Sequence, residues 1–122
     1  MRTLISIIQP RLEQGQLLSD GLWELLDQQA YLEYRDSADF DTAWIHAYQK
    51  LHRDGLKPVE QEQVTEWSRL AFEQVIRGSG SADLAAYIAD DVDLIFCAYL
   101  LGLEDEFVHW LAACYAEQRL PA

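Results

Sequence analysis

A chain of 122 residues in which 50% are hydrophobic, with four Trp, six Tyr and four Phe, has ample material for one buried core, and this composition excludes a disordered chain. The 21 acidic side chains outnumber the nine basic ones and give a formal net charge of −12. Because phosphate binding needs cationic side chains, this charge argues against nucleic acid as a direct ligand. The length predicts a single domain over residues 1–122.

The N-terminal segment, MRTLISIIQPRLEQG, has only a short apolar run from Leu4 to Ile8. This run is shorter than the ~7–15-residue core of a signal peptide. No segment approaches the ~20 apolar residues that a membrane span needs. We therefore expect a soluble, cytoplasmic protein that does not act at a membrane.

Hydrophobic residues recur with a helical period from the start of the chain. Residues 3–14 predict a helix whose start Pro10 should delay, or whose axis it should kink. Residues 20–35 predict a second helix that begins at an Asp cap. The inward-facing residues of this second helix are expected to be Leu22, Leu25, Leu26 and Ala30.

The most regular apolar stripe follows in DFDTAWIHAYQKLHRDG, residues 39–55. Its spacing of i, i+3, i+4, i+7, i+8 and i+11 predicts one continuous amphipathic helix. Ser37 or Asp39 can cap the start of this helix, and Gly55 suits the left-handed position after its end. The predicted buried face consists of Phe40, Ala43, Trp44, Ala47, Tyr48 and Leu51.

The remaining predicted helices cover residues 58–77, 82–101 and 104–118. Pro58 suits the first turn of the first of them, and Gly78 ends it. The GSGS segment, residues 78–81, is the flexible loop that follows, and Gly102 separates the last two helices. No alternating, β-rich run occurs. The predicted fold class is an all-α, single-domain bundle of five or six helices.

An offset of 44 residues aligns Trp23 with Trp67, Leu26 with Leu70, and SADF (37–40) with SADL (81–84). A two-helix unit of this length would form stacked α-hairpins, an architecture that suits a helical adaptor or scaffold. Chance similarity between short helical segments is the alternative explanation.

The cysteines and histidines do not indicate a metal centre. Cys97 and Cys114 lie among apolar residues at helical spacing, and we expect both to be reduced core thiols. His46 and His52 are six residues apart on one predicted helix, which puts them on different faces. With His109, they are predicted to lie on the surface. We predict no cofactor.

No sequence motif indicates catalysis. The chain has no HExxH, GxSxG, phosphate-loop or dinucleotide fingerprint. The DDVD segment, residues 90–93, has the density of a Mg²⁺ site, but the next acids, Glu104 to Glu106, follow about ten helical residues later, roughly 15 Å away. One ion is too small to bridge the two groups. We therefore predict a protein that is not an enzyme.

The acidic side chains of the last third are the most unusual feature of the sequence. Between Gly78 and Gln118 there are eight acidic residues and no Lys or Arg. Three of them, Asp90, Asp91 and Asp93, lie in the otherwise apolar segment YIADDVDLIF. An ordinary solvated surface mixes both signs of charge, so this region predicts a face that meets a cationic partner.

Two arrangements of these aspartates are open. In the first, residues 82–101 form one helix, whose core stripe consists of Ala85, Ile88, Val92, Ile95 and Tyr99. The opposite side of this helix then carries Asp83, Asp90, Asp91 and Asp93 and, toward the C-terminus, Leu94, Cys97 and Leu101. If the helix breaks at Ala89, Asp90 becomes an N-cap and the other two occupy the first turn, where the helix dipole favours them. No Gly or Pro marks such a break, so we favour one helix.

The segment DVDLIFCAYLLGLEDEFVHWLAACY resembles the helix–turn–helix near the end of some helical immunity proteins of bacterial toxin–immunity systems. In those proteins an apolar helix ends at a Leu-Gly pair, and a second helix then begins with acidic residues. The resemblance implies a small, acidic, helical, cytoplasmic protein that blocks a nuclease or another toxin through a charged face.

The sequence thus predicts a non-enzymatic protein that binds and neutralises a basic protein partner, which the resemblance identifies as a cognate toxin. A phage-type inhibitor of a nucleic-acid-binding complex and a secretion chaperone or adaptor are the alternatives, ahead of a metal-dependent enzyme. Tyr31 and Tyr34 are candidate interface anchors. The predicted partner-binding residues are Asp83, Asp90, Asp91, Asp93, Leu94, Glu104, Asp105 and Glu106.

Overall fold

The computed structural model describes residues 1–122, and all of its regular secondary structure is helical. The elements are α1 (Arg2–Glu13), α2 (Leu22–Leu25), α3 (Gln28–Arg35), α4 (Ala38–Gln49), the 3₁₀ turn η1 (Arg53–Gly55), α5 (Pro58–Ser79), α6 (Ala82–Leu101) and α7 (Glu106–Ala116). The prediction of an all-α fold with five or six helices is confirmed, since six of the α-helices have at least eight residues and α2 has four.

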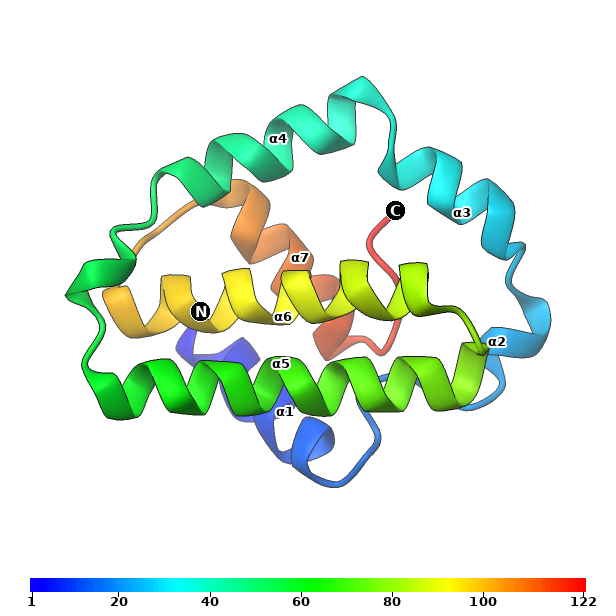
Figure 1. Cartoon of the computed structure of the whole chain (residues 1–122), viewed down its shortest axis with the longest axis horizontal. Helices are drawn as coiled ribbons and strands as arrows, with labels where there is room; N and C mark the ends of the chain where they lie inside the picture. The colour runs from blue at the N-terminus through cyan, green and yellow to red at the C-terminus, as the bar shows by residue number, and fades with distance from the viewer.

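Helix α6 lies at the centre of the arrangement. It runs antiparallel to α5 along its whole length, while α1 and α7 pack on each other on the far side of this pair (Figure 1). The segment from α3 to α4 crosses from one end of α6 to the other and leaves room for side chains between the backbones (Figure 1). We call this segment, residues 28–49, the α3–α4 arch.

Eleven of the 20 residues of α6 are buried, so this helix is covered on most of its circumference. An amphipathic surface helix buries only one stripe. The predicted core stripe of α6 is confirmed, because four of its five members are buried and Tyr99 is half-buried. The prediction that α6 is one continuous helix is also confirmed, and a break at Ala89 is excluded.

Capping side chains set most of the helix boundaries. Ser37 accepts a hydrogen bond from the Phe40 N–H and caps α4, which confirms one of the two predicted caps. Ser81 caps α6 in the same way, and Pro58 occupies the first turn of α5 as predicted. Gly102 ends α6 in the left-handed region with φ of 68°, where glycine carries no steric penalty.

Three predicted boundaries are wrong. The helix expected over residues 20–35 is two helices, because Leu26 is extended and the Asp27 carboxylate caps α3 by accepting from the Ala30 N–H at 3.0 Å. Helix α4 ends at Gln49, so Gly55 lies in η1 and does not occupy a left-handed cap. Gly78 lies inside α5. The helix predicted over residues 3–14 is found as α1, and of the two effects predicted for Pro10 the delayed start does not occur, because the helix begins at Arg2.

The 44-residue offset is not a structural repeat. Trp23 lies in the four-residue helix α2, whereas Trp67 lies in the middle of the 22-residue helix α5. The SADF and SADL segments are alike because each begins with a serine that caps a helix. The stacked α-hairpin architecture therefore does not describe this fold.

Two other predictions from the sequence, on the cysteines and on membrane spans, can be compared with the structure. Cys97 and Cys114 are free and buried, as predicted. None of the helices combines the length and the apolar character that crossing a bilayer requires.

Gly78 provides a test of how α2 packs on α5. A Cβ atom at this position would overlap the Trp23 indole ring. Helix propensity alone would make Gly78→Ala stabilising by about 1 kcal/mol. We expect the opposite, a loss of about 1 kcal/mol or more in the free energy of unfolding, because the indole must be displaced. Urea denaturation followed by Trp fluorescence measures this change.

Gly21→Ala is the matched control, because a Cβ atom there meets nothing within 4 Å. A Gly78→Ala protein more stable than the wild type would show that Trp23 does not pack on α5 as described.

Candidate functional site

The Asp91 carboxylate is the meeting point of four helices. From α3, Arg35 donates two hydrogen bonds to it, Nη2 to Oδ1 at 2.7 Å and Nη1 to Oδ2 at 2.9 Å. From α4, Trp44 Nε1 donates to Oδ1 at 2.9 Å, and from α7 the Tyr115 hydroxyl donates to Oδ2 at 2.5 Å. One carboxylate on α6 therefore ties both halves of the arch and the last helix to the centre of the fold.

This ion pair lies entirely inside the protein. Asp91 is 0% exposed and Arg35 is 4% exposed. Burial opposes the charge on the guanidinium, but the Asp91 carboxylate outweighs it and raises the pKa of Arg35. Burial, together with the same carboxylate, raises the pKa of Tyr115 well above 10, so this hydroxyl remains a donor. Burial raises the pKa of Asp91 as well, although the charge of Arg35 and the hydrogen bonds from Arg35, Tyr115 and Trp44 oppose this shift.

Two aromatic rings hold the guanidinium from its sides. The Arg35 Cζ atom lies 4.4 Å from the centroid of the Phe40 ring and 4.9 Å from that of the Tyr87 ring. The Tyr31 hydroxyl donates to the Pro121 carbonyl at 3.0 Å and so connects the C-terminal tail to the same cluster. Arg35 Nε alone has no hydrogen-bond partner.

Two further acids of the lysine- and arginine-free region are also paired. Arg53 of η1 donates to Asp93 at 2.6 and 3.3 Å. Lys50 donates to Asp105 at 2.7 Å, and Asp105 also caps α7 by accepting from the Val108 N–H. Although burial acts in the other direction, these donors lower the pKa of Asp105. The cations absent from residues 79–117 are thus supplied by residues 35–53.

The predicted partner-binding residues divide into three groups. The outward orientation expected for Asp91 and Leu94 is wrong, because both are 0% exposed. Asp93 and Asp105 are half-buried and have basic partners. The four that are exposed and form no ion pair are Asp83, Asp90, Glu104 and Glu106.

These four exposed acids do not form one continuous face. Asp83 and Asp90 are seven residues apart on α6, so they lie on the same side of the helix, with Tyr87 between them. Glu104 and Glu106 follow the other end of α6, where they line a hollow of about 430 Å³ with Met1, Leu103 and His109. About 20 Å of helix separates Asp90 from this hollow.

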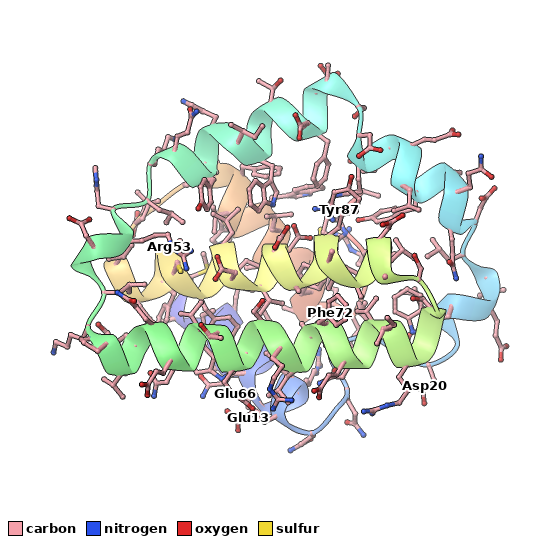
Figure 2. All side chains as sticks on the ribbon, in the orientation of Figure 1. Glu13, Asp20, Arg53, Glu66, Phe72 and Tyr87 are labelled. Atoms are coloured by element: carbon pink, nitrogen blue, oxygen red, sulfur yellow. The ribbon has the colours of Figure 1, made fainter.

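A groove lies between the arch and α6, beside Asp90. Its volume is about 180 Å³, and Figure 2 shows Tyr87 on the side of α6 that faces the arch. We call it the α4–α6 groove, and the residues that line it are Arg35, Phe40, Asp41, Trp44, Ile45, Tyr87 and Asp90. Of these residues, Asp41 and Asp90 are exposed, whereas Arg35 is buried.

Sequence reasoning missed Asp41 and Ile45 because they lie outside the buried stripe of α4. Ile45 is 42% exposed, and so is Tyr48, whose ring stacks on Trp44 at 5.5 Å between centroids. An isoleucine on the solvent side of an amphipathic helix was the available signal. Tyr31, a candidate anchor, is buried, whereas Tyr34 is 38% exposed.

No group of three or more His, Cys, Asp or Glu side chains is placed to hold a metal ion. His46, His52 and His109 lie exposed, as predicted. The fold is an all-helical body with exposed acids beside a groove that aromatic side chains line.

A comparison with models of protein families shows which family the chain belongs to. The family model described as Immunity protein PIM1 matches residues 7–122, and the chain therefore belongs to this immunity-protein family. No curated protein matches the chain. Membership agrees with the predictions of an immunity protein and of a non-enzymatic role, and it implies a cognate toxin as partner.

Neighbouring aspartates of α6 should respond differently to the same substitution. Asp91→Asn leaves Arg35 buried without a counter-charge, and we expect it to lower the free energy of unfolding by about 3–5 kcal/mol. Asp90 has no ion-pair partner and is exposed, so Asp90→Asn should change it by less than about 0.5 kcal/mol. Urea denaturation of both variants at pH 7 measures the difference. Equal losses in the two variants would contradict the structural role assigned to Asp91.

Proposed function

We propose that this immunity protein neutralises a toxin with a basic surface, and that the exposed acids Asp83 and Asp90 are part of the contact. The observation that carries the proposal is that these carboxylates have no basic partner of their own, although every acid of the YIADDVDLIF segment except Asp90 is paired. Glu104 and Glu106 are a second candidate contact at the other end of α6.

The charge of the whole molecule supports a cationic partner. With a net charge of −12, the protein attracts a basic toxin over distances comparable to the Debye length, ~8 Å at physiological salt. Such steering raises the association rate, and the contacts then determine the dissociation rate. The rigidity conferred by the buried ion pair favours this mode, because a preformed surface loses little conformational entropy on binding.

A nuclease is the toxin class that this charge fits best. An enzyme that cleaves nucleic acid needs a basic cleft to hold the phosphates, and an acidic protein surface can occupy that cleft. The proposal also places the protein in the cytoplasm, where such a toxin reaches its substrate. Neutralisation would then be competitive with nucleic acid.

Charge reversal at matched positions tests the proposal. The toxin would be captured from the source cell at low salt with the tagged protein, identified by mass, and then produced as a purified protein. We expect Asp83→Lys combined with Asp90→Lys to weaken its binding by at least about tenfold, and we expect the wild-type affinity to fall as salt rises. Titration calorimetry at several salt concentrations measures both effects.

The control is Glu24→Lys combined with Glu62→Lys, which changes the net charge equally on exposed positions of α2 and α5. A third pair, Glu104→Lys with Glu106→Lys, tests the other end of α6. Toxin binding that is insensitive to salt and to all three double variants would contradict the proposed basic partner, though not membership of the family.

A further inference from the structure

We infer that the α4–α6 groove receives the tip of a loop of the toxin, which places one Lys or Arg side chain between Asp41 and Asp90. The inference rests on the proposed function, since it assigns to a particular site the contact with the basic partner. The shape of the groove, its apolar surface and its charge all support it.

The size of the groove limits what can enter. About 180 Å³ corresponds to the volume of roughly six water molecules. This space suits a single long side chain or the tip of a loop, and it is too small for a helix. Its walls come from two helices that the Asp91 network holds at a fixed separation, so the groove exists before the partner arrives.

The centre of the groove region is apolar and aromatic. Trp44 and Ile45 line the groove, and Ile45 is 42% exposed. Tyr48 is equally exposed but does not line the groove, and its ring stacks on Trp44. Exposed aromatic and aliphatic side chains that surround a small hollow are typical of binding hot spots. The methylene stem of a Lys or Arg side chain can lie along this apolar surface while its charged head stays at the edge.

The edge of the groove is acidic and lacks compensation. The positive charge of Arg35 is matched by Asp91 behind it, whereas Asp41 and Asp90 form no ion pair. Burial, and then the nearby carboxylates of Asp91 and Asp93, raise the pKa of Asp90. A cation placed beside Asp90 would relieve this repulsion, which favours Lys or Arg over a neutral residue.

Three conservative substitutions test the site with the purified toxin obtained as described above. We expect Asp41→Asn, Asp90→Asn and Ile45→Ala each to weaken toxin binding by roughly tenfold or more, as for residues of a hot spot. Glu62→Gln removes the same charge from an exposed position on α5 and should change the affinity by less than about twofold. All four side chains are exposed, so circular dichroism and urea denaturation should confirm unchanged folding.

The proposal that the toxin contacts this groove would be overturned if Asp41→Asn, Asp90→Asn and the control Glu62→Gln all caused the same small loss of toxin affinity and Ile45→Ala caused none. In that case salt-sensitive toxin binding would still support the proposed function. Salt-insensitive binding by the wild type would instead contradict the proposed function itself. The two failures are therefore distinguishable.

Discussion

The Asp91 carboxylate accepts hydrogen bonds from α3, α4 and α7, and the position of the arch depends on them. Helix α4 lies away from α6 at the level of the backbone, so the contact between them is made by side chains such as Trp44 (Figure 1). Without the ion pair to Arg35, the arch would lose its charged anchor, and one of the residues that line the α4–α6 groove would no longer be held in place.

Adjacent residues of α6 take opposite roles because a helix turns by about 100° per residue. Asp91 points into the interior, where it organises four helices, whereas Asp90 next to it points toward the groove and the solvent. Asp93 lies on a third side and pairs with Arg53 of η1. A single run of acids therefore supplies one structural carboxylate, one partly exposed ion pair and one free carboxylate for a partner.

The helical content was predictable from the sequence because hydrophobic periodicity and caps such as Ser37 are local signals. The pairing of the acids was not, since Arg35 and Arg53 approach α6 from segments about 40 to 56 residues earlier in the chain. Leu94 shows why the outward face was misassigned. A second apolar side on α6 indicated a helix that is covered all round, and not a docking surface.

A double-mutant cycle between Arg35 and Asp91 tests most directly whether this pair holds the arch on α6. Arg35→Met and Asp91→Leu should each destabilise the protein by about 3–5 kcal/mol, because each leaves one buried charge alone. The free energy of unfolding lost by the double variant should be about 2–3 kcal/mol smaller than the sum of the two single losses. Urea denaturation at pH 7 measures all three losses. Losses that simply add would contradict the account, because they would mean that the two side chains stabilise the fold independently.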